Sequence, residues 1–174
     1  MKLLSRYDKG NPAPRYDRSM VLICGSFIEQ GLEQAIKTVL LKEAEERSLS
    51  SELFGGDKPG AINGFYGKII LGYSLGLYTK YFRDDLDRVR HIRNAFAHSK
   101  LELSFKTKEI ADVSHFYCSD FFKESSEKAK RNLEDPRQSF LFMAFFAVLT
   151  FQLTQKDSAG VGHPEGYPDD RILP

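Results

Sequence analysis

The stretch from Thr79 to Lys100, TKYFRDDLDRVRHIRNAFAHSK, predicts a long amphipathic helix and sets the fold class. Threonine is a preferred N-cap residue, and aspartates in the first turns with arginines towards the end match the helix dipole. Apolar side chains recur every three or four residues and form one stripe, which consists of Leu86, Val89, Ile92 and Phe96. A polar helix with one apolar stripe packs against other helices, so we expect an all-α fold.

Two more helices are expected on the N-terminal side of this stretch. Apolar residues recur at helical spacing from Ser19 to Arg47, and the Gly- and Pro-containing loop Leu53–Gly60 then stops any helix. A second helix is expected from Ala61 to Leu77. It contains glycines at positions 64, 67, 72 and 76. Because an interior glycine costs about 1 kcal/mol relative to alanine, we expect these glycines to allow close approach of a neighbouring helix.

The C-terminal side predicts two further helices after a short extended segment. Residues Leu101 to Phe105 alternate apolar and polar side chains, which is typical of a short strand or of an extended connector. A fourth helix is expected over Ile110–Lys130, and Pro136 suits the first turn of a fifth. Within the fifth helix Phe140–Phe151 is apolar except for Thr150. This run is too short to span a bilayer, so it predicts either a helix buried on all sides or a partner interface.

The expected organisation is a single domain between two irregular ends. Residues 1–17 contain glycine and prolines among charges and predict a flexible N-terminal arm. Residues 18–154 form the helical domain, a bundle of about five helices, and residues 155–174 form a Gly/Pro-rich tail.

Composition excludes several classes of function. The chain has 25 Lys and Arg against 24 Asp and Glu, so a net charge of +1 argues against extended DNA binding or a membrane-coating basic field. Two cysteines, Cys24 and Cys118, cannot build a disulfide scaffold or a four-ligand zinc site. No apolar leader follows Met1, so we expect a cytoplasmic protein.

Two weak motifs do not support a cofactor or metal. The glycine-rich loop Gly55–Gly60 is not a Walker loop, because the only Gly-Lys pair, Gly67-Lys68, is followed by Ile69 instead of Ser or Thr. His115 and Cys118 are three residues apart, but no second ligand pair accompanies them. We expect no cofactor and no metal.

The run from Arg88 to Lys100 contains arginines, histidines and a lysine without any carboxylate. In a chain whose charges otherwise balance, this run predicts one local anion site. The candidate binding residues are Arg90, His91, Arg93 and Lys100.

Within this run, Arg93, Asn94 and His98 permit two interpretations. At about 100° per residue, Asn94 and His98 lie about 40° apart, whereas Arg93 lies about 140° from His98. Arg93 and His98 therefore reach one phosphate only if the helix ends near His98 or two copies come together, which suggests a homodimer. They would then suffice for metal-independent RNA cleavage, with His98 as general acid or base and Arg93 neutralising charge on phosphorus.

The second interpretation is structural. Asn94 and His98 would cap or cross-link helices, and Arg93 would pair with a carboxylate of the first helix, such as Glu29 or Glu33.

Two families share these residues. The pattern Arg93-Asn94-x-x-x-His98 resembles the R-x(4–6)-H motif of the HEPN superfamily, all-helical domains that include ribonuclease toxins. A longer set resembles the mannitol operon repressor (MltR) family, in the segments 53–56, 68–77, 92–98, 103–105 and 109–110. The chain departs from that family at Ala95, where an acidic residue is usual, and at Gly72, where alanine is common.

The resemblance implies a helical transcriptional regulator without a DNA-binding domain of its own. Such a repressor acts through a protein partner, and the arm, the tail and the Phe140–Phe151 helix are the surfaces expected to bind it. The alternative is a HEPN-type ribonuclease or toxin that binds RNA and uses Arg93, Asn94 and His98 as its catalytic residues.

Overall fold

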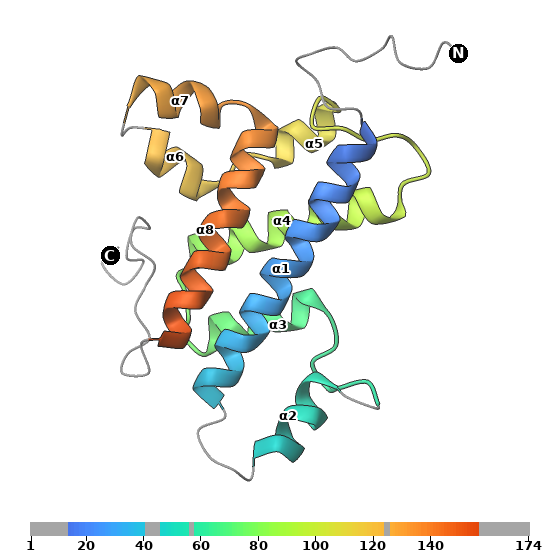
Figure 1. The fold of residues 1–174 in the computed structure, drawn as a ribbon, viewed down its shortest axis with the longest axis vertical. Helices are drawn as coiled ribbons and strands as arrows, with labels where there is room; N and C mark the ends of the chain where they lie inside the picture. The colour runs from blue at the N-terminus through green and yellow to red at the C-terminus, as the bar shows by residue number, and fades with distance from the viewer. Residues whose placement is uncertain (1–13, 41–45, 56–57, 124–125, 157–174) are drawn as a thin grey trace.

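A computed structural model describes residues 14–40, 46–55, 58–123 and 126–156. Within these ranges the chain forms eight α-helices and no strand (Figure 1). The helices are α1 (Pro14–Leu40), α2 (Glu46–Phe54), α3 (Phe65–Ser74), α4 (Lys80–His98), α5 (Lys108–Val113), α6 (Tyr117–Lys123), α7 (Glu127–Leu133) and α8 (Pro136–Lys156). The all-α prediction is confirmed, and the described residues hold more and shorter helices than the five expected.

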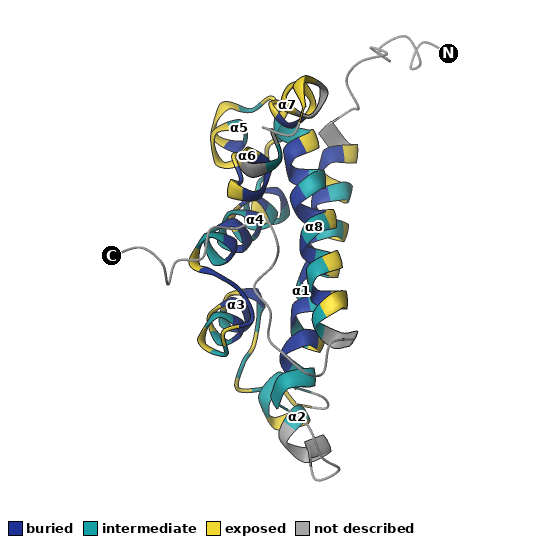
Figure 2. Cartoon of the chain, turned by 90° about the vertical axis from the view of Figure 1, so that its left-hand side faces the viewer, coloured by how far each residue is buried: buried dark blue, intermediate teal, exposed yellow. Residues whose placement is uncertain are grey.

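The longest helices, α1 and α8, lie side by side and run in the same direction (Figure 1). Asp17 near the start of α1 pairs with Arg137 near the start of α8 at 3.1 Å, and Gly31 faces Phe151 further along. Helices α3 and α4 lie on one side of this two-helix layer (Figure 2). The opposite side of the layer is covered by none of the described helices.

The core lies between the layer and α4 and is rich in aromatic rings. Phe82 of α4 contacts Phe151 of α8 with ring centroids 5.8 Å apart, and Tyr78 lies 5.4 Å from Phe82. The Tyr78 hydroxyl donates a hydrogen bond of 2.7 Å to the Ile69 carbonyl, which satisfies a buried polar group. Burial raises the pKa of Tyr78, so this hydroxyl stays protonated.

Helix α4 forms as the sequence predicts. The Thr79 hydroxyl accepts a hydrogen bond of 3.4 Å from the Phe82 amide, so Thr79 is the N-cap. All four residues of the predicted stripe are buried, and the helix ends at His98.

The helix expected over residues 61–77 is shorter than predicted, because two of its glycines stand at its ends. Gly64 precedes α3 with φ of +98° and Gly76 follows it with φ of +72°, a backbone conformation that glycine adopts at little cost. Gly72 does allow close approach. A Cβ there would lie 2.8 Å from the Tyr78 hydroxyl and 3.0 Å from Leu32 Cδ1.

The expected first helix also has different bounds. Helix α1 begins at Pro14, five residues before the predicted start, and Asp17 is buried. It is described as far as Leu40, and α2 begins at Glu46; residues 41–45 of the expected first helix lie outside the described residues. Residues 14–17 therefore belong to α1, whereas residues 1–13 of the expected arm and residues 157–174 of the expected tail lie outside the described residues.

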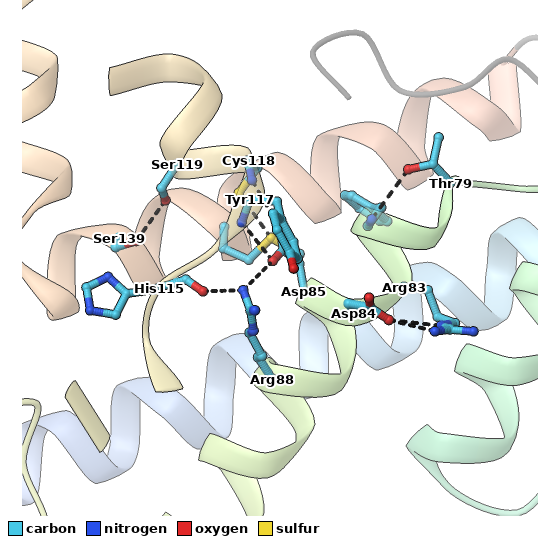
Figure 3. A network of polar contacts seen from close by, with 12 residues as sticks. Thr79, Arg83, Asp84, Asp85, Arg88, His115, Tyr117, Cys118, Ser119 and Ser139 are labelled. Atoms are coloured by element: carbon cyan, nitrogen blue, oxygen red, sulfur yellow. Dashed lines mark hydrogen bonds and ion pairs between the residues drawn. The ribbon is translucent and has the colours of Figure 1, made fainter. Parts of the chain in front are cut away.

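The single helix expected over residues 110–130 is wrong, because α5, α6 and most of α7 occupy this segment. The break before α6 has a physical cause in α4. The buried Asp85 carboxylate accepts hydrogen bonds from the Tyr117 and Cys118 amides at 2.9 and 3.0 Å, so it caps a new helix there (Figure 3). Residues 101–105 form no strand and connect α4 to α5; the Phe105 amide donates to Asp17 at 3.3 Å.

Helix α8 starts at Pro136 as predicted but is not buried on all sides. Phe140 and Phe151 are buried, whereas Phe145 is 67% exposed. The prediction that this apolar run is buried on all sides is therefore wrong, and a partner interface is the prediction that remains. None of the helices in the described ranges has the length and hydrophobicity needed to cross a membrane.

Candidate functional site

The run from Arg88 to Lys100 contains no carboxylate of its own. The fold, however, places carboxylates from other parts of the chain beside it. Each of its arginines lies within 4 Å of a carboxylate supplied by another turn or another helix. The pairs are Arg88 with Asp85 at 3.4 Å, Arg90 with Asp87 at 2.7 Å, and Arg93 with Glu29 at 3.3 Å. The positive charge that predicted a local anion site is therefore largely balanced.

Arg93 points from α4 towards α1, and its pairing with Glu29 is the one that the structural interpretation predicts. The side chain crosses α1 at Gly25, where a Cβ would lie only 2.8 Å from Arg93 Cδ. Its guanidinium then reaches the Glu29 carboxylate at 3.3 Å. Glycine at position 25 thus makes room for the arginine stem, and the ion pair joins α4 to α1.

Glu29 belongs to a larger group of ion pairs at the junction of α1, α3 and α4. Lys68 of α3 lies 3.0 Å from Glu29 and 2.9 Å from Glu33, and all three side chains are mostly buried. Burial alone would lower the pKa of Lys68, but its hydrogen bonds to Glu33 and Glu29 outweigh burial and raise the pKa. Burial raises the pKa of Glu33, yet hydrogen bonds from Lys37 and Lys68 outweigh it and hold this pKa below its usual value. Both groups are therefore charged at neutral pH.

Arg88 belongs to a different contact, on the side of α4 that faces α6 (Figure 3). Its guanidinium lies over the Tyr117 ring at 4.6 Å and donates to the His115 carbonyl as well as to Asp85. Asp85 is fully buried, and burying an unpaired carboxylate is costly. The positive charge of Arg88 balances the negative charge of this carboxylate. Arg88 thus holds the segment before α6 onto α4.

Arg90 and His91 share one aspartate at the seam between α3 and α4. Arg90 Nε lies 2.7 Å from Asp87, and the exposed His91 Nε2 lies 3.2 Å from the other oxygen of the same carboxylate. The Arg90 guanidinium also lies over the Tyr66 ring of α3 at 5.0 Å. His91 is therefore exposed, whereas most of the Arg90 side chain is buried and Asp87 balances its charge.

Asn94 and His98 lie on the solvent side of α4, together with His91. His98 is exposed and is the last residue of the helix, and Lys100 is exposed just beyond it. In the described part of the chain, no hydrogen bond or ion pair engages the side chains of Asn94, His98 or Lys100. The structure thus places half-buried Asn94 and exposed His98 on the same side of α4, whereas Arg93 points to α1.

The end of α4 is held by α1. The Arg18 guanidinium donates a hydrogen bond of 2.9 Å to the Ala97 carbonyl, in the last turn of α4. A cation at this position interacts favourably with the helix dipole and satisfies a terminal carbonyl. Arg18 therefore brings a further positive charge beside the last turn that carries His98.

Sequence reasoning missed the role of Asp85, although the sequence contains a signal for it. Asp85 falls in register with the buried residues Phe82 and Val89, at a spacing of three and four residues. A carboxylate inside an apolar stripe needs partners, and the α6 amides and Arg88 supply them. Lys68 carries no comparable signal, since its partners belong to a distant helix.

His115 and Cys118 do not form a joint site. His115 is exposed, whereas Cys118 is buried with its sulfur 3.3 Å from that of Met143. Among the residues with described positions, no three His, Cys, Asp or Glu side chains are grouped so that they could hold a metal ion.

Comparisons with protein-family models, curated proteins and solved structures give no match to this chain.

Proposed function

We propose that the protein is a transcriptional regulator of the mannitol operon repressor kind, with a HEPN/MltR-like helical domain, that acts by binding another protein. The pairing of Arg93 with Glu29 at 3.3 Å carries this proposal. An arginine that neutralises a phosphoryl group must be free to turn its guanidinium towards the substrate. Arg93 instead uses its guanidinium to join α1 and α4, which is a structural task.

The exposed stripe of α4 is the surface that we assign to the partner. His91, Asn94 and His98 follow one another at steps of three and four residues, and Lys100 is exposed just beyond the end of the helix. They present imidazole, amide and ammonium groups suited to hydrogen bonding with a polar or acidic segment of a protein. The nearly balanced net charge of +1 fits such a partner better than a long nucleic acid.

A metal-independent ribonuclease is the second candidate, and one observation favours it. Helix α4 ends at His98, and His98 is exposed. An end at this position is the condition under which Arg93 and His98 of one chain could turn towards one phosphate. The ribonuclease would require Arg93 to leave Glu29 when RNA binds.

His98→Gln separates the two candidates. Glutamine retains hydrogen bonding but cannot transfer a proton near neutral pH. For a regulator, we expect deletion of the gene to change the transcript level of a specific operon, and His98→Gln to restore that level as the wild type does. His115→Gln is the matched control, because His115 is an exposed histidine outside α4.

An RNA cleavage assay with purified protein tests the ribonuclease directly. We expect neither the wild type nor His98→Gln to cleave single-stranded RNA in the presence of a chelator. RNA cleavage that disappears with His98→Gln but not with His115→Gln would overturn the regulator and establish the ribonuclease.

A further inference from the structure

The side of the α1–α8 layer that faces away from α3 and α4 carries no charge on its exposed residues. We call this side the outer face. Its exposed residues between positions 19 and 34 of α1 and between 138 and 153 of α8 are Ser19, Ile23, Phe27, Gln30, Gln34, Gln138, Phe145, Leu149, Gln152 and Leu153. Since 28% of the chain is charged, this absence distinguishes the outer face from the rest of the surface.

The apolar residues of the outer face form one area shared by both helices. Phe27 is 59% exposed in α1, and Phe145 is 67% exposed in α8. Because Asp17 is level with Arg137 and Gly31 with Phe151, these two phenylalanines lie at similar heights along the parallel helices. Figure 2 shows exposed residues of the layer on the side away from α3 and α4. The exposed polar residues of the outer face are Ser19 and four glutamines, none of which carries a charge.

We propose that the outer face binds the outer face of a second copy of this chain and forms a homodimer with two-fold symmetry. In such a dimer each patch meets itself, so a charge close to the two-fold axis would lie opposite its own copy. An uncharged face avoids this repulsion, and the glutamine amides can both donate and accept hydrogen bonds with their copies. A surface that binds a charged partner would instead carry complementary charge.

The size of the face is sufficient for specific association. Helix segments of about 16 residues are about 24 Å long, and two neighbouring helices are about 20 Å wide. Each copy would therefore cover about 500 Å², and the dimer would bury about 1,000 Å² in total, at the lower end for specific interfaces.

This arrangement has a consequence for α4. Helices α3 and α4 lie on the opposite side of the layer from the outer face (Figure 2). The two copies of His98 would point away from the dimer interface, and each α4 stripe would bind its own ligand. The dimer therefore differs from the shared Arg93 and His98 site that the sequence suggests, and it stands independently of the proposed regulatory function.

Sedimentation velocity on the full chain tests the proposal. We expect the wild type at about 100 µM to sediment with twice the chain mass of 19.9 kDa. Phe145→Glu should place like charges near the axis and raise the dimer dissociation constant more than about tenfold. The double substitution Gln30→Glu with Gln152→Glu should have the same effect with almost no change in side-chain shape.

The control is Leu101→Glu, because Leu101 is 76% exposed but lies on the connector after α4. We expect this variant to remain dimeric, and circular dichroism should show unchanged helix content in all variants. A monomeric wild type, or a dimer that persists in both outer-face variants, would overturn the proposal. Neither measurement depends on transcription or RNA, so its failure leaves the proposed function to its own test.

Discussion

Helix α4 and the outer face of α1 and α8 differ in the number of charged residues that they carry. In α4 the arginines and aspartates are numerous, and the fold supplies a partner for each arginine between Arg83 and Arg93. The exposed part of the outer face has no charge at all. Charge in α4 joins helices within one chain, whereas its absence on the outer face leaves that surface able to meet its own copy.

The largest expected effect is the removal of a buried charge from α4. Asp85→Ala should lower the free energy of unfolding by about 3–5 kcal/mol, because Arg88 and two α6 amides lose their acceptor. Asp84→Ala is the matched control: the neighbouring carboxylate pairs with Arg83 at the surface and should cost less than about 1 kcal/mol. Urea unfolding at fixed protein concentration measures both. Equal losses in the two variants would contradict the distinct role of Asp85.

A smaller effect should separate two neighbouring positions of α1. Glu29→Gln removes the carboxylate between Lys68 and Arg93 and should cost about 1–2 kcal/mol of unfolding free energy. Gln30→Glu adds a charge to the outer face one residue later and should change the stability of the monomer by less than about 0.5 kcal/mol. The two positions compare the side of α1 that faces α3 and α4 with the outer face. A larger loss of monomer stability for Gln30→Glu than for Glu29→Gln would contradict the different roles of these two sides.

The smallest effect is a dependence of stability on pH at the ion pair between Glu33 of α1 and Lys68 of α3. The pKa of Glu33 is lowered in the folded chain, so its contribution to stability is complete above the ordinary value of 4.5 and declines as pH falls through the folded pKa. The pKa of Lys68 is raised, so its contribution is complete below 10.5 and declines as pH rises through the folded pKa. Thermal melts between pH 3 and 6 should show a shallower loss of Tm for Glu33→Gln than for the wild type. Parallel curves would show that Glu33 does not contribute.

The sequence predicts α4 well because its signals are local. The Thr79 cap and the stripe of Leu86, Val89, Ile92 and Phe96 lie within one helix and can be read along the chain. Inspection of the Arg88–Lys100 run alone, however, overestimates the positive charge of the predicted anion site. The carboxylate that pairs with Arg93 belongs to α1, more than sixty residues earlier, and only the alternative pairing with Glu29 anticipates it.

Helix boundaries fail where the cause lies in another part of the fold. The helix expected over residues 110–130 is divided because Asp85 of α4 caps the start of α6, and no residue within the segment indicates this. Gly64 and Gly76 are read as interior glycines, although positive φ values place them at the ends of α3. The exposure of Phe145 also follows from neighbours, because composition does not tell which side of α8 meets α1.

The parallel pairing of α1 and α8 determines when the chain can complete its fold. These helices are joined through the Asp17–Arg137 ion pair, although 120 residues separate these two residues along the chain. Contacts between such distant segments form late, since the loop between them must first be closed. During synthesis from the N-terminus, α1 therefore emerges long before the helix that lies beside it. The apolar sides of α1 must remain without α8 until α8 leaves the ribosome, so this early helix is a part of the nascent chain that needs protection from aggregation.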